Sequence, residues 1–89
     1  MAVLANILDK KLGISQRVRA RRREAKISQA ELAKNSGVSL GSVKRFEGCG
    51  EISLSALLRI AAVLGYENDF EKLFERKNYQ SIEEILNAK

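Results

Sequence analysis

The stretch QAELAKNSGVSLGSVKRF, residues 29–46, constrains the fold more than any other part of the chain. Ser28 and Glu31 fit an S-x-x-E capping box, in which each side chain accepts a hydrogen bond from the backbone N–H of the other residue. Gly37 stands where a residue that ends a helix can take the left-handed conformation without a Cβ penalty. Ser39 can then cap a following helix. These signals predict two short helices joined by a tight turn.

The apolar residues of this stretch fit two helices that cross closely. Ala33 stands at the expected crossing point, where only a small side chain allows the approach. Val38 and Val43 are expected to fill the space between the helices, and Phe46 to close the core below them. Because Lys44 and Arg45 are left exposed, the combination is typical of the helix-turn-helix pattern.

Further signals divide the rest of the central region into helices. Gly65 is expected to end a helix that Ser53 caps, and its apolar stripe follows i, i+3, i+4 spacing at Leu54, Leu57, Leu58, Ala61 and Leu64. An arginine-rich helix is expected at residues 15–25, around Val18. Another is expected at residues 68–76, with one apolar face made of Phe70, Leu73 and Phe74.

The two ends of the chain predict additional helices. Residues 2–12 align Leu4, Leu8 and Leu12, and Gly13 is expected to end that helix. Near the C-terminus, a second capping box precedes an apolar stripe; these residues are Ser81, Glu84, Ile82, Ile85 and Leu86. Strand signals are weak throughout, so the predicted fold class is all-α. A length of 89 residues implies one domain with one small core.

The charge of the chain is distributed unevenly. Residues 1–48 hold 11 Lys or Arg against 4 acids, which gives +7, and residues 49–89 hold 5 against 7, which gives −2. The two parts sum to the net charge of +5. A basic front and a mildly acidic back predict either a face that binds a polyanion beside a face with another task, or simply the solvated surface of a basic protein.

The composition disfavours several other classes of protein. The chain has no histidine and one cysteine, Cys49, so it cannot form a His/Cys zinc site or a Ser-His or Cys-His nucleophile pair. Its acids are scattered singly, and we expect neither an enzyme nor a metal or cofactor. No apolar run approaches a membrane span, and no signal peptide is visible. A cysteine without an internal partner fits the cytoplasm, which is the predicted location.

The stretch from Ser15 to Phe74 resembles the phage-repressor-like helix-turn-helix proteins, the lambda repressor and Cro superfamily of XRE type. The resemblance rests on ISQAELAKNSGVS, on F-E-G at 46–48 and on SLSALLRIAAVLG at 53–65. It implies a five-helix domain over residues 15–76 that places the second motif helix, residues 40–47, in the DNA major groove. Residues 1–14 and 77–89 are expected to form an N-terminal helical extension and a C-terminal helical tail.

The resemblance also implies which residues reach base edges: Ser39, Leu40, Gly41, Lys44 and Arg45. Arg45 is the preferred direct contact, because arginine bonds guanine O6 and N7 bidentately, whereas Lys44 is expected at either a base or a phosphate. Leu40 can contact a thymine methyl group, and Gly41 either allows a close approach or is simply tolerated. Members of the family often carry polar residues at these last two positions. Specificity is therefore expected to rest on Arg45 and on DNA shape.

Other residues are expected to hold the DNA backbone or the domain itself. Gln29 begins the first motif helix, where free N–H groups attract phosphate, and the resemblance implies a phosphate contact there. Arg22 matches a family arginine that pairs with the glutamate at Glu47 and so orients the recognition helix. The further phosphate candidates, each of which could equally be solvated surface, are Arg17, Arg19, Arg21 and Lys34.

The preferred interpretation is a sequence-specific repressor of transcription that binds double-stranded DNA and associates with the nucleoid. The alternative is an antitoxin-type protein, because the tail GYENDFEKLFERKNYQSIEEI resembles tails of small helix-turn-helix proteins that are paired with HipA-type kinase toxins. That interpretation adds a toxin-like protein as a partner. Membrane binding is disfavoured because little apolar surface opposes the arginines of residues 15–25, and RNA binding because exposed aromatic residues are scarce.

A homodimer with two-fold symmetry is also expected, because one recognition helix offers few base contacts. One candidate interface is the N-terminal stripe of Leu4, Leu8 and Leu12. Alternatively, both end stripes could extend the chain's own core. The preferred interface is the C-terminal set of Tyr79, Ile82, Ile85 and Leu86 together with Phe70 and Phe74.

Overall fold

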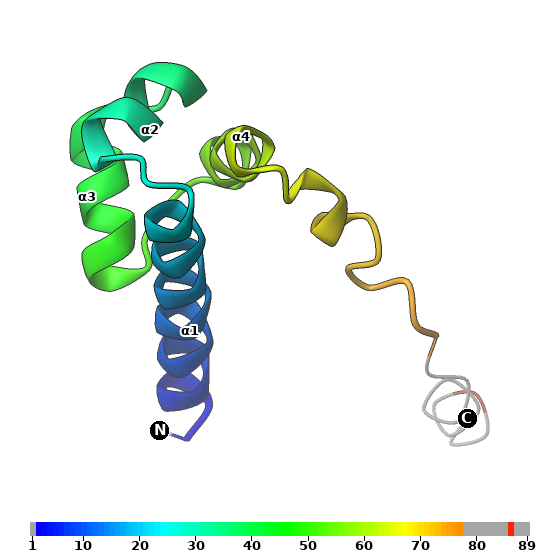
Figure 1. Cartoon of the computed structure of the whole chain (residues 1–89). Helices are drawn as coiled ribbons and strands as arrows, with labels where there is room; N and C mark the ends of the chain where they lie inside the picture. The colour runs from blue at the N-terminus through cyan, green and yellow to red at the C-terminus, as the bar shows by residue number, and fades with distance from the viewer. Residues whose placement is uncertain (1, 78–85, 87–89) are drawn as a thin grey trace.

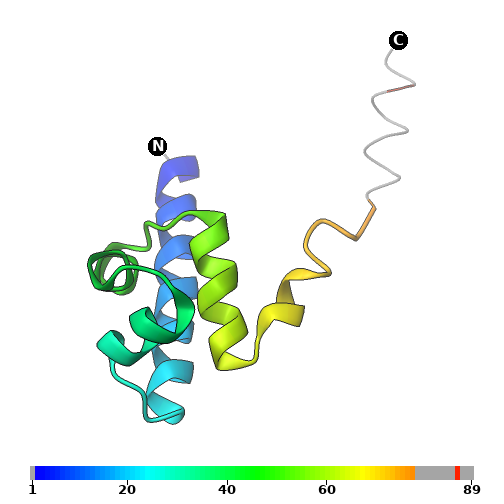
Figure 2. The same cartoon turned by 90° about the horizontal axis from the view of Figure 1, so that it is seen from above.

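The computed structural model describes residues 2–77 and residue 86, and within them the fold is all-helical, as predicted. Four α-helices are followed by one 3₁₀ turn. They are α1 (Ala2–Glu24), α2 (Gln29–Ser36), α3 (Leu40–Cys49), α4 (Leu54–Leu64) and η1 (Glu67–Phe70). In Figures 1 and 2, α2 and α3 lie on one side of α1 and α4 lies on the other, and the chain after α4 leads away from these helices.

The caps at both ends of α2 and α4 and at the start of α3 are those predicted from the sequence, whereas α3, predicted to end at residue 47, runs to Cys49 and is capped by Gly50. Ser28 and Glu31 form the capping box, with the Glu31 N–H donating to Ser28 Oγ and the Ser28 N–H donating to Glu31 Oε1. Ser39 and Ser53 cap α3 and α4. Gly37 and Gly65 take the left-handed conformation at φ of 74° and 85°. The capping box at residues 81–84 lies outside the described residues.

The predicted helix end at Gly13 is wrong. α1 runs without a break from Ala2 to Glu24, so the boundary expected between residues 1–14 and 15–76 falls inside one helix. A glycine in a helix interior costs about 1 kcal/mol relative to alanine, which tertiary packing can override. The helix packs on both sides of this glycine: Lys11 pairs with Glu51, and Arg22 pairs with Glu47. Because both halves of the helix have partners on or beside α3, one glycine does not divide it.

The helix expected at residues 68–76 is also absent. A single 3₁₀ turn, η1, stands at its start, and no side chain caps it. Glu71 and Leu73 donate backbone hydrogen bonds to carbonyls three residues earlier rather than four. Phe74 has a φ of 61° and is fully exposed, so Phe70, Leu73 and Phe74 do not share a buried face. The described part therefore has four α-helices where the resemblance implied five.

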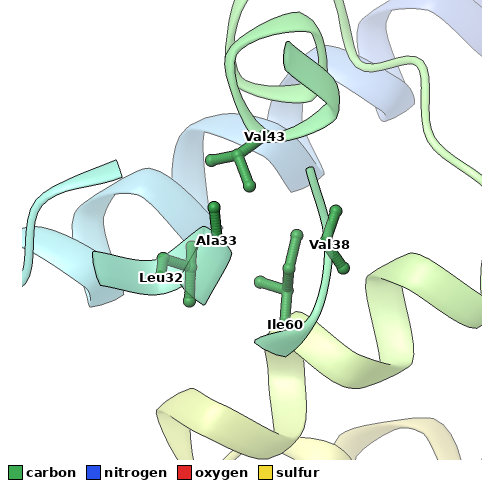
Figure 3. Packing of buried hydrophobic residues seen from close by; sticks show 5 residues of the cluster. All are labelled: Leu32, Ala33, Val38, Val43 and Ile60. Atoms are coloured by element: carbon green, nitrogen blue, oxygen red, sulfur yellow. The ribbon is translucent and has the colours of Figure 1, made fainter. Parts of the chain in front are cut away.

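The core is centred on the turn between α2 and α3. Figure 3 shows Ala33, Val38 and Val43 converging with Leu32 and Ile60, and all five are buried. Phe46 is also buried. The predictions that Ala33, Val38 and Val43 pack together are confirmed, and Phe46 is buried as expected.

The buried face of α4 differs from the stripe predicted for it. Ile60 is fully buried, whereas Leu54 and Leu58 are exposed. Ala61 is buried as expected, and Leu57 and Leu64 are half-buried. Because α4 is apolar on nearly every side, spacing alone could not determine which face meets the core.

Candidate nucleic-acid interface

The turn between α2 and α3 fixes where α3 begins. The Gly37 N–H donates to the Ala33 carbonyl over 3.0 Å. Ser39 then caps α3, because its Oγ accepts from the Ser42 N–H over 3.1 Å and donates to Ser42 Oγ over 2.8 Å. The Ser39 hydroxyl, which was predicted to contact a base, is thus engaged in holding the first turn of α3.

The outward face of α3 carries the other four residues that were predicted to reach bases. Leu40, Gly41, Lys44 and Arg45 are all exposed. Val43, on the opposite side of the helix, is fully buried. The structure therefore brings the four predicted readers together on one solvent-facing surface, which we call the α3 outer face.

The structure shows no reason within the fold why position 41 must be glycine. A Cβ atom built at this position would meet no atom within 4 Å, and the φ of Gly41 is not in the left-handed region. Gly37 and Gly65 differ, since their positive φ values favour glycine. The glycine at position 41 thus leaves open space on the α3 outer face itself.

A buried carboxylate ties α3 to the helices behind it. Arg22 Nε donates to Glu47 Oε2 over 2.7 Å, and Arg22 Nη2 donates to Glu47 Oε1 over 2.9 Å. The side chains of Arg22 and Glu47 are only 9% and 4% exposed. Arg22 Nη1 also donates to the Ile27 carbonyl, so a single guanidinium joins α1, the loop after it and α3. The predicted ion pair has bidentate geometry, which favours one fixed orientation of the two helices.

The ionisation of this pair follows from its surroundings. Burial raises the pKa of Glu47, but the hydrogen bonds from Arg22 and Gln29 and the charges of Arg22 and Arg19 outweigh burial. The pKa of Glu47 therefore lies below its ordinary value. The hydrogen bond to Glu47 raises the pKa of Arg22, against the effect of burial. Both groups stay charged at neutral pH.

Gln29 belongs to the same cluster. Its side-chain Nε2 donates to Glu47 Oε1 over 2.9 Å, which joins the first turn of α2 to the last turns of α3. Arg19 Nε lies 3.9 Å from the same oxygen, with its side chain about half exposed. Of the residues predicted to contact phosphate, Gln29 and Arg19 thus lie next to Glu47, near the C-terminal end of α3. Lys34 is exposed on α2.

The remaining two phosphate candidates lie elsewhere. Arg17 and Arg21 line a cavity of about 380 Å³ between α1, α4 and η1. Arg21 Nη2 donates to Glu24 over 2.9 Å. The structure thus places these two arginines toward α4 and not beside α3.

A family model described as helix-turn-helix matches residues 18–69, more than half of the chain. The chain belongs to this helix-turn-helix family. Its type is the lambda repressor-like, XRE type that the sequence resembles. Neither a curated protein nor a solved structure matches the chain. As a helix-turn-helix protein of this type, the chain is a DNA-binding regulator of transcription.

Sequence reasoning missed a groove beside the helix-turn-helix motif. The groove has a volume of about 330 Å³ and is lined by Arg45 and Ser42 of α3, by Glu51, Ile52 and Ser53 of the loop before α4, and by Ala56 in the first turn of α4. Ser53 caps α4 there, with its Oγ accepting from the Ala56 N–H over 3.1 Å. The cap itself was visible in the sequence, but its position next to Arg45 depends on the path of the intervening loop.

A second missed feature joins α1 to the loop after α3. Lys11 Nζ pairs with Glu51, and the hydrogen bond and charge of Lys11 lower the pKa of the Glu51 carboxyl group. Gly50 ends α3 at a φ of 79°, and a Cβ there would meet Lys11 Cβ at 2.9 Å. The partners stand 40 residues apart, so no local pattern in the sequence indicates this contact.

No cluster of three or more His, Cys, Asp or Glu side chains that could hold a metal ion occurs in the described part of the chain. No helix of residues 2–77 is long and apolar enough to cross a membrane. The expected absence of a metal, of a cofactor and of enzymatic activity stays a prediction. The helix-turn-helix family is one of DNA-binding regulators, typically without enzymatic activity.

Proposed function

We propose that this helix-turn-helix protein is a sequence-specific repressor that reads the DNA major groove with α3. The observation that carries the proposal is the α3 outer face, where Leu40, Gly41, Lys44 and Arg45 are exposed together above a buried side. A helix that enters the major groove needs a surface of this kind.

Each residue of the α3 outer face has a distinct role in the proposal. Arg45 bonds the O6 and N7 atoms of a guanine, and Lys44 contacts a guanine or a phosphate. Leu40, which is 38% exposed, contacts a thymine methyl group. Gly41 lets the helix backbone approach the base edges, which the open space around its position supports.

Contacts to DNA phosphates fix how deeply α3 enters the major groove and which base pairs it faces. We assign them to the backbone N–H groups at the start of α2, to Arg19 and to Lys34. The Gln29 side chain acts through Glu47, since its amide donates to that carboxylate. The cluster of Arg22, Gln29 and Glu47 thereby holds the α2 N-terminus and α3 in one orientation. Arg17 and Arg21, which line the cavity toward α4, contribute only to the overall positive charge.

Repression follows from occupancy. A domain bound over a promoter excludes other proteins from the same DNA, and this requires no contact besides DNA binding. We propose that the protein acts as a homodimer on two half-sites about one helical turn apart, because one α3 offers few base contacts. Its place of action is then the nucleoid, in the cytoplasm.

An antitoxin-type function is the second candidate. Leu73 is 56% exposed and Phe74 is fully exposed in the segment after η1. Two large apolar side chains in solvent fit a protein partner, and this segment belongs to the tail that resembles those of kinase-toxin partners. Purification from its native host separates the candidates: a stoichiometric kinase-like partner favours the antitoxin function.

The experiment that tests the proposed function is selection of bound duplexes from a random DNA pool by the full chain. We expect one enriched sequence with two-fold symmetry, whose half-sites contain a guanine that Arg45 contacts. A pool that remains random after several rounds contradicts sequence-specific reading. An enriched sequence without symmetry retains the reading by α3 and contradicts the homodimer.

A further inference from the structure

The first turns of α1 carry an apolar surface that no other described part of the chain covers. Val3 and Leu4 are 71% and 61% exposed, and Ile7 and Leu8 are each 49% exposed. Figure 1 shows α1 continuing past the other helices toward its N-terminal end, and Figure 2 agrees. We call Val3, Leu4, Ile7 and Leu8 the α1 apolar face. Exposed apolar surface on one side of a helix marks an interaction site when it is contiguous.

The α1 apolar face continues the buried side of the same helix. At 3.6 residues per turn, Leu4, Leu8 and Lys11 point to the same side as Ser15 and Arg22. Ser15 is fully buried and Arg22 pairs with Glu47 of α3. One side of α1 is therefore suited to packing along its whole length, and only its first turns lack a packing partner among the described residues.

The chemistry of this face fits an apolar, uncharged partner surface, such as a second copy of the same face. Residues 2–8 carry no charged side chain, so nothing there attracts an acidic protein or the headgroups of an anionic membrane. The same absence means that two copies of the face meet without repulsion between like charges. A two-fold interface places the same surface patch on both subunits and therefore requires such self-complementarity.

The position of the face fits the proposed function. Lys11 packs against Gly50, so the first turns of α1 leave the body of the protein beside the C-terminal end of α3. Gly41 and Leu40 begin the opposite end of that helix. A second copy docked on the α1 apolar face leaves the base-reading end of α3 uncovered.

We propose that the α1 apolar face is a two-fold interface with a second copy of this chain. The proposal rests on the proposed function for its role, since it supplies the homodimer that two half-sites require. Four partly exposed side chains from each copy give a contact smaller than the roughly 1,200–2,000 Å² of a specific, stable interface. The dimer is consequently weak in solution, and DNA that carries two half-sites stabilises it.

The test uses sedimentation velocity on the full chain and on two double variants. Leu4→Gln with Leu8→Gln makes the α1 apolar face polar while keeping good helix propensity. The matched control, Leu73→Gln with Phe74→Gln, removes two exposed apolar residues from the other candidate region. Circular dichroism establishes that both variants keep the wild-type helix content. The measurements cover micromolar to near-millimolar protein concentrations.

We expect the wild-type chain and the control variant to dimerise equally, and the α1 variant to require at least about tenfold more protein, a shift of about 1.4 kcal/mol. Dimerisation of the α1 variant at wild-type strength overturns the proposal. Loss of dimerisation in the control alone also overturns it and moves the interface to the segment after η1. A wild-type chain that stays monomeric throughout, as when its own residues 78–89 cover the face, overturns it as well.

Binding to a single half-site separates this proposal from the proposed function. The α1 variant should bind a duplex with one half-site at wild-type affinity, because its α3 outer face is unchanged. It should lose only the increase in affinity that the wild-type chain shows when the duplex carries two half-sites. If the wild-type chain binds no half-site, the proposed function fails, whereas the sedimentation result still decides the interface.

Discussion

At the scale of single residues, Glu47 connects more of the interface than any other side chain described. It accepts hydrogen bonds from Arg22 and Gln29 and lies near Arg19. The sequence and its resemblance predicted the pair with Arg22. They did not predict the bond from Gln29, because Gln29 stands 18 residues away and a phosphate was its expected partner. The three partners of Glu47 come from separate parts of the chain, so only the folded structure shows that they meet at one carboxylate.

The ionisation of Glu47 predicts how stability depends on pH. Its folded-state pKa is lowered, so its contribution is present above the pKa of the unfolded chain and is lost as pH falls through the folded pKa. At neutral pH, Glu47→Gln should lower the free energy of unfolding by about 1–3 kcal/mol, because charge-assisted hydrogen bonds are lost. Urea titrations of both proteins from pH 7 downward should show this difference narrowing in acid. A difference that is constant with pH contradicts the assigned role.

Gly41 offers a test of the close approach to DNA. A Cβ at this position meets no atom, so Gly41→Ala should raise the free energy of unfolding by up to about 1 kcal/mol. If the backbone lies close to base edges, the same methyl group should weaken binding to the selected site. Unfolding titrations and DNA binding are measured on the same variant. Greater stability with unchanged binding would mean that glycine is merely tolerated there.

At the scale of elements, cap residues were the most reliable guide. Both ends of α2 and α4 and the start of α3 were predicted from serines and glycines that act within a few residues of themselves, whereas Gly50, which ends α3, was not predicted. Predictions failed where no local signal decides the outcome, as they also did for the helix expected at residues 68–76. Gly13 does not end a helix, because contacts to Glu47 and Glu51 hold both halves of α1. The face of α4 could not be assigned because most of its sides are apolar.

Gly13 distinguishes the continuous helix from two separate helices. In the interior of α1, Gly13→Ala should raise the free energy of unfolding by up to about 1 kcal/mol. The new Cβ approaches only the flexible end of Arg17, at 3.2 Å from Nη1. At a helix end in the left-handed conformation, the same change would instead destabilise the protein. Thermal or urea unfolding of the variant gives the sign, and a loss of stability contradicts the continuous α1.

At the scale of the whole molecule, the positive charge lies in the same part of the chain as the helix-turn-helix motif. The basic residues concentrate in the first 48 residues, which include α1, α2 and most of α3. The sequence therefore predicts that this part of the chain meets DNA, and the structure divides its arginines into two groups. Arg19 lies beside Glu47 and α3, whereas Arg17 faces the cavity toward α4. Alternate positions on one helix point to different sides, and this could not be assigned before the neighbours of α1 were known.

The division of the arginines predicts the salt dependence of binding. The logarithm of affinity should fall linearly with the logarithm of salt concentration, with a slope of about −0.9 per phosphate neutralised. Arg19→Ala should reduce this slope by about one phosphate, and Arg17→Ala, as the matched control, should leave it nearly unchanged. Fluorescence anisotropy at several salt concentrations measures the three slopes. An equal loss in both variants contradicts the division, and a flat wild-type response contradicts binding to DNA.

The central claim is that α3 reads sequence through Arg45, and the most direct measurement is a set of affinities for single-base variants of the selected site. The wild-type chain and Arg45→Ala are titrated against the site and against every substitution in one half-site. The account predicts that Arg45→Ala loses about 1–3 kcal/mol on the parent site and no longer discriminates at one guanine position, while preferences at the other positions remain. An Arg45→Ala protein that keeps the full pattern of preferences contradicts the claim.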